Sequence, residues 1–227
     1  MIRRKKDNVE WLEFEQLQEF PNLVHGVFTR HVGISGETFL NILEIEKLVS
    51  IVQVHGANVL HVSSEKQELD GGFDALTTAQ NNMGLLIKHA DCQATIFFDP
   101  IQKVIANVHC GWRGSVHNIY ANTVKELIQK YHCNPANLLA CISPSLGPNK
   151  AEFINHRVEL PPTFLPFQVR ENYFDFWEIS RMQLKEVGLL DHHIEIAKMC
   201  TFTEEKDFFS YRRDKKTSNN GTVVALR

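Results

Sequence analysis

Three apolar segments of the sequence each deliver a metal-binding side chain to the point where a turn begins. They are the segments 52–56, 87–92 and 108–114, and they carry His55, Cys92 and His109. Side chains at strand ends can converge on one point while the strands keep them rigid. Two imidazoles and one thiolate suit zinc, and a catalytic zinc site has three protein ligands and one open position. The pattern therefore indicates a zinc site, although the ligands lie too far apart in sequence to form a finger motif.

The same three residues could instead be ordinary parts of a core. A histidine beside glycine often packs or caps, and a single cysteine is commonly buried as an apolar residue. Two charged neighbours favour the functional interpretation, because Asp91 directly precedes Cys92 and Arg113 follows His109 by four positions. Burying a charge is costly unless it is paired. Charges gathered near a metal are less costly than charges scattered through a core.

Short strands dominate the middle of the predicted fold, and helices follow them. Apolar and β-branched runs predict strands over 23–29, 48–54, 59–62, 84–87, 94–98, 104–108, 138–142 and 222–226. Apolar spacing predicts helices over 116–131 and 176–187, with Gly188 as the stop of the second. Gly71, Gly72 and Asp74 predict a loop. The basic run at 3–6 is expected to be a frayed terminus. The class is mixed α and β, and 227 residues without a linker favour one domain.

Composition excludes several classes of partner. The formal net charge of −3 gives no global attraction to nucleic acid or to an anionic membrane. No apolar run approaches the roughly 18–20 residues of a membrane span, and the N-terminus lacks the apolar stretch of a secretory signal. The five cysteines form no CxxC pair, which argues against a disulfide framework and a zinc ribbon. We therefore expect a cytoplasmic protein without nucleic-acid or membrane partners.

The motifs around these ligands resemble those of a known family. The central pair is HADC at 89–92 followed by HCGWRG at 109–114. Further matches are TRHVGIS at 29–35, LN at 40–41, QVHG at 53–56, SPSLGP at 143–148, CT at 200–201 and FSYRR at 209–213. In this order they resemble the YfiH family, whose members are also described as polyphenol oxidase (laccase), peptidoglycan editing factor and purine nucleoside phosphorylase.

This resemblance implies a fold, a metal and a reaction. The fold would be α+β, a single domain over 1–227 with layered sheets flanked by helices, similar to cysteine hydrolases of the deamidating-toxin type. The metal would be zinc, or less favourably copper, held by His55, Cys92 and His109. The activity would be that of a purine nucleoside phosphorylase with adenosine deaminase activity, acting on adenosine, inosine and methylthioadenosine. The partners would then be a small nucleoside and phosphate, and we expect a monomer.

The remaining site residues are assigned as hypotheses. Cys92, Asp91 and Arg113 are the catalytic candidates, with Asp91 transferring a proton or orienting a metal ligand. Arg30, Asn41, Gln53 and Arg113 are the candidates for binding substrate. An alternative for Arg113 is an ion pair with a core carboxylate. His89 is expected to pack behind the ligands, and the aromatic residues at 208–211 could line a base pocket or cover the surface as a hairpin.

The sequence departs from the family pattern at several places, and other functions remain open. The stretch between Asn41 and Gln53 is short, and the positions 32, 143, 151 and 220–222 differ from the usual residues. A first rival is an amidase that edits peptidoglycan precursors, with Cys92 as nucleophile and His109 as base. A second is a copper laccase, which the absence of any His-x-His pair disfavours. A third is a metal-binding module without catalysis.

Overall fold

The computed structural model describes residues 1–63 and 72–227, so Gly71, which the sequence placed in a loop, lies outside the described part. Most of the described strands form two six-stranded sheets. The first sheet has the order β1 (Ile2–Lys6), β2 (Val9–Glu13), β3 (Leu23–Phe28), β14 (Asn220–Leu226), β7 (Met83–His89) and β4 (Lys47–Ser50). Its neighbours are antiparallel except β4 and β7, which run parallel.

The second sheet carries most of the residues that matter for the site. Its order is β13 (Ile194–Ile196), β10 (Leu139–Ile142), β8 (Gln93–Asp99), β9 (Val104–Cys110), β6 (Ala75–Thr78) and β5 (Val59–His61). The central pairs β10–β8, β8–β9 and β9–β6 are antiparallel. Each edge strand runs parallel to its neighbour, β13 to β10 and β5 to β6. A small ribbon is formed by β11 (Gln168–Arg170) and β12 (Tyr173–Phe174).

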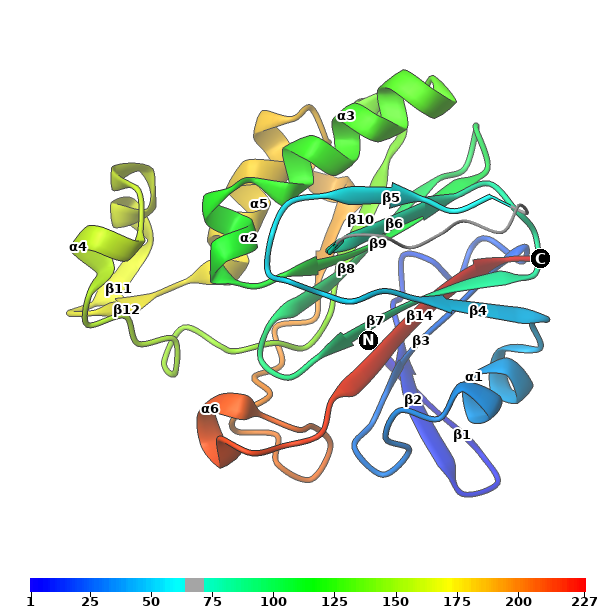
Figure 1. Ribbon diagram of the computed structural model, residues 1–227, viewed down its shortest axis with the longest axis horizontal. Coiled ribbons are helices and arrows are strands. Elements are labelled where there is room, and N and C mark those ends of the chain that lie inside the picture. The colour runs from blue at the N-terminus through cyan, green and yellow to red at the C-terminus, as the bar shows by residue number, and fades with distance from the viewer. Residues whose placement is uncertain (64–71) are drawn as a thin grey trace.

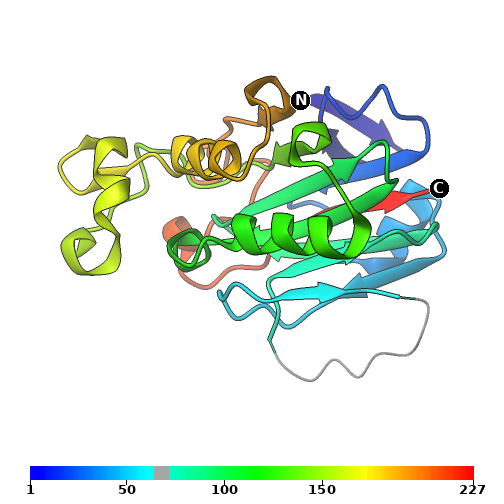
Figure 2. The same ribbon diagram turned by 90° about the horizontal axis from the view of Figure 1, so that it is seen from above.

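The two sheets face each other, and helices cover their outer faces (Figures 1 and 2). The largest core cluster lies between the sheets and joins Leu85 and Val224 of the first sheet to Ile96 and Ile105 of the second. Helices α3 (Ile119–Tyr131) and α5 (Phe176–Glu186) pack on the second sheet, and α1 (Gly36–Leu43) packs on the first. The expected α+β fold of layered sheets flanked by helices is confirmed.

Strand β9 is buried on both of its faces. All seven of its residues are buried, because one face meets the other sheet and the opposite face meets α3. Ile105 belongs to the core between the sheets, whereas Val104, Ala106 and Val108 belong to the core under α3. A strand covered on both sides reads as a continuous apolar run. The rigid end of this strand carries His109.

The sequence located most elements but missed several boundaries. The strand expected over 48–54 ends at Ser50, and the helix expected over 116–131 begins only at Ile119 as α3, after a separate short helix, α2 (Trp112–Val116). Asn118 separates them with a φ of 51° and caps α3 by accepting a hydrogen bond from the N–H of Ala121. Gly188 follows α5 with a φ of +99°, in keeping with its expected role as a stop.

The expectation of a frayed N-terminus is wrong. Residues 2–6 form β1, which pairs antiparallel with β2. The basic side chains bind acidic neighbours: Arg3 bonds to Glu10 and to Asp207, and Arg4 bonds to Glu13. Ion pairs across the strands therefore hold a segment whose charge alone suggested solvation.

The remaining elements form the connections and a lobe that projects from the sheets (Figure 1). The lobe contains α4 (His156–Glu159), the 3₁₀ helix η2 (Pro162–Phe167), β11 and β12. Short turns elsewhere are η1 (Pro135–Asn137), η3 (Asp191–His193) and α6 (Tyr211–Asp214). The aromatic residues at 208–211 thus lead into a helical turn, so the hairpin alternative is wrong. None of the described helices combines the length and apolar character needed to cross a membrane.

Candidate metal centre

The register of the second sheet places three reactive side chains next to one another. Ala75 of β6 pairs with Val108 of β9, so Asp74 lies opposite His109, and its carbonyl accepts the His109 N–H at 2.6 Å. Ala94 of β8 pairs with His109 on the other side. Because side chains alternate along a strand, Cys92 points to the same face as Ala94 and His109. Neighbouring strand ends therefore bring Cys92, His109 and Asp74 together.

His55 reaches the same place from a loop. Its φ of 60° is unusual for a residue with a side chain. The Asp74 carboxylate stabilises this turn by accepting the backbone N–H groups of Val54 at 3.2 Å, His55 at 2.9 Å and Gly56 at 2.7 Å. The loop that carries His55 is thus fixed to the start of β6.

The candidate ligand atoms of His55, Cys92 and His109 all lie within 4.8 Å of one another. The two imidazole rings are 4.9 Å apart between centroids and almost perpendicular, at 80°. His109 is buried, Cys92 is half-buried and His55 is exposed, so the group opens to solvent on the His55 side. Zinc bonds of about 2.0–2.3 Å to nitrogen and sulfur require such a close group. The donor set fits zinc.

The charges of this group support a thiolate. Burial alone would raise the pKa of Cys92, but His109 and His55 outweigh it and lower the pKa to about 6. Burial alone would lower the pKa of His109, but Cys92 and Asp74 outweigh it and raise the pKa to about 9. These shifts favour a thiolate beside an imidazolium before any metal binds. A thiolate is the form of cysteine that binds metal or attacks as a nucleophile.

Asp74 is a buried acidic residue beside the candidate ligands that the sequence did not single out. Its side chain is 0% exposed, and its Oδ1 accepts a hydrogen bond from Nδ1 of His109 at 2.8 Å. Burial would raise its pKa, but the hydrogen bonds from His109, Gly56 and His55 lower it overall. The signal in the sequence is a lone acidic residue directly before the buried strand 75–78. A buried carboxylate needs donors, and here a histidine and a turn supply them.

Gly111 provides the space for the ligands. A Cβ atom at this position would lie 2.8 Å from Sγ of Cys92 and 3.2 Å from Cδ2 of His55. Its backbone is extended, with a φ of −82°, so its requirement is for space and not for an unusual conformation. The glycine of the HCGWRG motif thus allows close approach.

Asp91 lies beside the metal group but binds other partners. Its carboxylate accepts the hydroxyl of Thr201 at 2.6 Å and the backbone N–H of Arg212 at 2.6 Å. Its backbone φ of 87° forms the turn before Cys92. The carboxylate that contacts a metal ligand is therefore Asp74, while Asp91 connects the Cys92 turn to the segment 201–212.

Arg113 has the environment of a free cation. It is exposed, and its guanidinium lies 4.2 Å above the ring of Trp112. No acidic side chain in the described part of the chain pairs with it, so the alternative of a core ion pair is wrong. Trp112 is half-buried against Phe153, with ring centroids 6.0 Å apart. The indole thus positions a guanidinium that remains available to an anion.

The other substrate candidates lie in different surroundings. Gln53 bonds through both atoms of its amide to the backbone of Lys88, at 2.7 and 2.9 Å, and so ties the His55 loop to β7. Arg30 donates to the carbonyl of Glu205 and lies 4.8 Å above the ring of Phe209. Asn41 is exposed on α1. The structure thus brings together the three candidate ligands His55, Cys92 and His109, while these three side chains lie outside that group.

Two further expectations concern buried neighbours. Cys110 lies on the opposite face of β9, in the core under α3, and burial raises its pKa to about 12. His89 is also buried and contacts the hydroxyl of Thr222 at 2.8 Å. Burial lowers the pKa of His89 to about 3. Both residues therefore pack near the site, and neither belongs to the group of three ligands.

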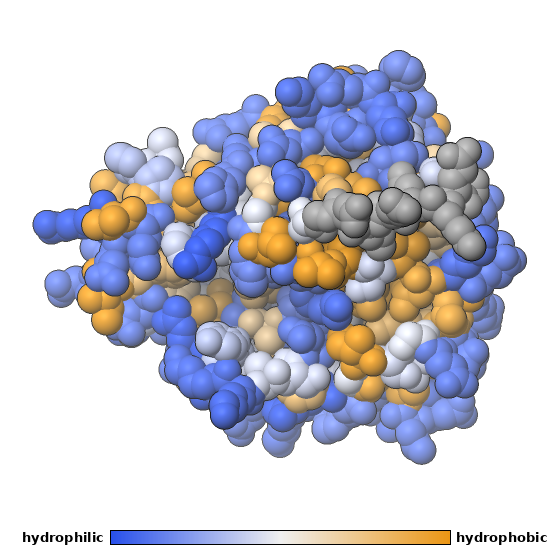
Figure 3. Space-filling view, viewed as in Figure 1, coloured by the Kyte–Doolittle hydropathy of each residue, from blue (hydrophilic) through white to orange (hydrophobic). Residues whose placement is uncertain are grey.

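The surface beside the centre is partly apolar. Val52 and Val54, which flank Gln53 just before His55, are 74% and 52% exposed. Figure 3 shows apolar side chains gathered over the middle of the face that carries the loop between β4 and β5. An exposed metal ligand thus adjoins an apolar surface.

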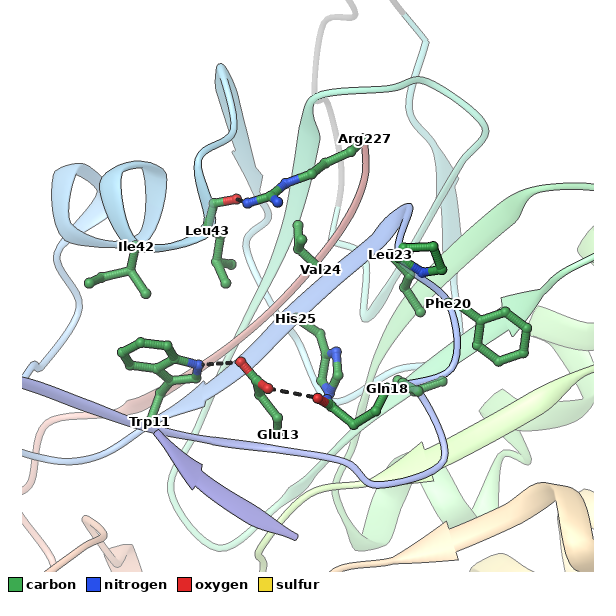
Figure 4. Close-up of a pocket in the computed structure, with 12 residues that line it drawn as sticks. Trp11, Glu13, Gln18, Phe20, Leu23, Val24, His25, Ile42, Leu43 and Arg227 are labelled. Atoms are coloured by element: carbon green, nitrogen blue, oxygen red, sulfur yellow. Dashed lines mark hydrogen bonds between the residues drawn. The ribbon is translucent and has the colours of Figure 1, made fainter. Parts of the chain in front are cut away.

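A separate hollow of about 260 Å³ lies between β2, β3 and the end of α1 (Figure 4). Its polar floor is internally paired: Glu13 accepts hydrogen bonds from Trp11, Arg4 and Gln18. Arg227 at its rim bonds to the carbonyl of Leu43. It contains none of the three ligands, and its pairing indicates a structural role.

Comparison with known proteins shows which family the chain resembles. A family model described as multi-copper polyphenol oxidoreductase laccase matches residues 29–227. The purine nucleoside phosphorylase of Bacteroides thetaiotaomicron is 29% identical over 255 residues, covering 94% of both chains. The purine nucleoside phosphorylase YfiH of Escherichia coli is 30% identical over 194 residues, covering 79% of this chain and 74% of that one.

Solved structures show the same fold. YlmD from Geobacillus stearothermophilus superimposes with a TM-score of 0.86 at 25% identity, covering 100% of this chain and 99% of that one. The hypothetical protein YfiH of Bacillus licheniformis superimposes with a TM-score of 0.84 at 23% identity, covering 99% of each chain. Matching motifs, fold and family model lead to one conclusion: the chain belongs to the YfiH family, whose model carries the laccase description.

Proposed function

We propose that the chain is a zinc-dependent purine nucleoside phosphorylase that also deaminates adenosine, with adenosine, inosine and methylthioadenosine as substrates. The observation that carries this proposal is the meeting of His55, Cys92 and His109 within 4.8 Å. The substrate class rests on the relatives, which are named purine nucleoside phosphorylase at 29% and 30% identity. A small site with a few convergent polar groups beside apolar side chains suits a small-molecule substrate.

The ligands have separate roles in this proposal. Cys92 supplies a thiolate, and His109 presents Nε2 because its Nδ1–H is donated to Asp74. His55 closes the group from the exposed side. When bound, zinc would supply Lewis acidity, which would make water acidic enough to attack C6 in deamination and would attract the oxygens of phosphate in phosphorolysis.

Arg113 is the proposed phosphate ligand. It follows His109 by four residues, and its guanidinium is exposed above Trp112. A guanidinium binds phosphate oxygens through two parallel hydrogen bonds, which fixes the orientation of the anion. In phosphorolysis, an oxygen of the phosphate held here would attack C1′ of the ribose, and the bond from C1′ to the purine would break.

The nucleoside itself would contact the exposed side of the centre. Val52 and Val54 offer an apolar surface to the faces of a purine. Arg30, Asn41 and Gln53 remain the proposed hydrogen-bonding residues for ribose and base. For Asp91 we propose a positioning role, since both of its carboxylate oxygens already accept hydrogen bonds from the segment 201–212.

Product analysis tests this function. Purified zinc-loaded protein is incubated with adenosine, with and without phosphate, and the products are separated by chromatography. Adenine that appears only with phosphate supports phosphorolysis, and inosine supports deamination. Cys92→Ala should abolish both products, whereas Cys110→Ala, on the other face of β9, should retain them. Turnover of no nucleoside by the zinc-loaded wild type would contradict the proposal.

A second candidate is the peptidoglycan-editing amidase, which one observation favours. Cys92, His109 and Asp74 stand in the order of a nucleophile, a base and the carboxylate that orients the base. A thiolate bound to zinc cannot attack a substrate, so metal content separates the two proposals. Hydrolysis of an amide in a murein precursor by metal-free protein, lost in Cys92→Ala, would support the amidase.

Metal analysis also tests the laccase and the metal-binding module. A multicopper laccase needs several copper sites, while the described residues hold one group of three suitable ligands. Copper binding with oxidation of a phenol would support the laccase. Stoichiometric metal without turnover of nucleoside, amide or phenol would support a metal-binding module.

A further inference from the structure

We infer that Asp74 is the positioning residue that assembles the metal centre, because its single carboxylate sets both histidine ligands at once. One contact orients the ring of His109, and the others fix the loop that carries His55. The inference rests on the metal site of the proposed function. By this inference, Asp74 links the affinity for metal to the conformation of the loop that carries His55.

The first contact selects the tautomer of His109. Oδ1 of Asp74 lies 2.8 Å from Nδ1 of His109 in a fully buried pair. A carboxylate is only an acceptor, so Nδ1 must carry a proton. The proton that His109 gives up when a metal binds is then the one on Nε2, whose lone pair can coordinate the metal. The ring is also restrained, because the backbone N–H of His109 donates to the Asp74 carbonyl at 2.6 Å.

The second set of contacts places His55. Three successive N–H groups, of residues 54–56, converge on the two carboxylate oxygens at 2.7–3.2 Å. This turn holds His55 at a φ of 60°, a left-handed conformation that is unfavourable for a residue with a side chain. The imidazole of His55 is exposed, and its polar partner is the thiol of Cys92, itself a ligand. The hydrogen bonds from the backbone to Asp74 therefore keep the imidazole of His55 next to Cys92 and His109, although Asp74 is not one of the three candidate ligands.

The chemistry of the contacts explains why an amide cannot replace the carboxylate. Four donors approach the two oxygens of Asp74: the ring N–H of His109 and the N–H groups of residues 54–56. In Asp74→Asn one oxygen becomes an NH₂ donor. If the NH₂ faces the loop, it repels the N–H groups that hold His55. If it faces His109, Nδ1 must become the acceptor, and the proton moves to the nitrogen that should bind the metal.

The test compares zinc affinities of metal-free wild type and variants by competition with a chromophoric chelator. Partners that orient a metal ligand typically contribute about 10- to 100-fold to metal affinity. We expect Asp74→Asn to weaken zinc binding by about that factor. The matched control is Asp99→Asn, since Asp99 is also 0% exposed and accepts the N–H groups of Ile101 and Gln102. Asp99 ends β8, whereas Cys92 precedes its start, so its loss should change zinc affinity less than about twofold.

A double-mutant comparison isolates the contact with the loop. In the His55→Ala background the position of the loop no longer affects the metal, so Asp74→Asn should lower affinity by a smaller factor than in the wild type. A residue that only stabilised the fold would lower affinity by the same factor in both backgrounds. Equal factors would therefore overturn the inference.

The wild type provides a readout that does not depend on the folding of a variant. Long-range ¹H–¹⁵N NMR of the His109 ring should show a protonated Nδ1 in zinc-loaded protein. A proton on Nε2, or zinc affinity unchanged in folded Asp74→Asn, would overturn this inference alone. A wild type that binds no zinc would overturn the metal centre as well, and nucleoside turnover without metal would contradict only the zinc requirement of the proposed function.

Discussion

His25 and His109 are buried to the same extent, each with 3% of its surface exposed, yet their pKa values move in opposite directions. Burial lowers the pKa of His25 to about 4, with only a partial offset from Glu13. At His109 burial acts in the same sense, but Cys92 and Asp74 raise the pKa to about 9. The partners of a buried histidine therefore decide its charge.

The hydrogen-bond partners of His25 and His109 explain why their pKa values shift in opposite directions. His25 lies in the hollow of Figure 4, where its Nε2 accepts the backbone N–H of Phe14 at 2.8 Å and its ring stacks on Phe14. An accepting nitrogen must be unprotonated, so this hydrogen bond favours the neutral ring. His109 instead donates to a carboxylate and faces a thiolate. One environment suits packing, and the other suits a cation: a proton, or a metal in its place.

The largest expected effect is the loss of metal binding in Gly111→Ala. The new methyl group would lie 2.8 Å from Sγ of Cys92 and would displace a ligand. Forcing a methyl group into a packed site costs about 1–3 kcal/mol, which corresponds to about 10- to 100-fold in affinity. Zinc titration of the folded variant measures this change.

The matched control lies in the other region. Gly26 adjoins His25, and a Cβ there would lie 3.0 Å from the ring of Phe28 and 3.1 Å from Trp11. Gly26→Ala should lower the free energy of unfolding by about 1–3 kcal/mol while zinc affinity stays unchanged. Equal zinc affinities in both alanine variants would contradict the assignment of the metal centre.

The second effect is the pH dependence of stability in metal-free protein. The folded pKa of His25 is about 4 against an ordinary value of 6.5, so the unfolded chain binds the proton first as pH falls. The contribution of His25 is full above pH 6.5 and is lost progressively towards pH 4. Between pH 7.5 and pH 5 the loss is about 2 kcal/mol. His25→Gln, which can still accept the Phe14 N–H, should remove about this much of the loss in urea unfolding experiments.

The metal centre should contribute little to this pH dependence. The contribution of His109 falls between pH 6.5 and 9, because its folded pKa is raised to about 9. The contribution of Cys92 rises over nearly the same range, because its folded pKa is lowered to about 6. The two slopes have opposite signs and cancel to a large extent. A steep alkaline loss of stability that disappears in Cys92→Ala would contradict this coupling.

The sequence singled out the three residues of the candidate metal centre but not the residue that supports them. His55, Cys92 and His109 were singled out because the sequence places each at or just after a predicted apolar strand. In the structure, neighbouring strands bring Cys92 and His109 together, and a loop brings His55 to them. Asp74 escaped because its donors come from residues 54–56 and 109, and only tertiary structure joins those segments. The strand at 2–6 escaped for the same reason, since its basic side chains pair with Glu10, Glu13 and Asp207.

The smallest structural effect is expected at Arg113. Because its guanidinium is exposed and unpaired among the described residues, Arg113→Ala should change the free energy of unfolding by less than about 0.5 kcal/mol. Hydrogen bonds to charged groups contribute about 1.5–3 kcal/mol, so the KM for phosphate should rise about tenfold or more. Steady-state kinetics at varied phosphate concentration measures this rise.

Arg170 offers a control of the same chemistry at another place. Its guanidinium also lies over an aromatic ring, 3.7 Å from the centroid of Tyr173, but on the projecting lobe. Arg170→Ala should leave the KM for phosphate unchanged. If both variants raised this KM equally, phosphate would be responding to the general positive charge of the surface. If only Arg113→Ala raised the KM, the guanidinium of Arg113 would be the group that binds phosphate. The region around His25 differs, because its polar groups are paired within the protein.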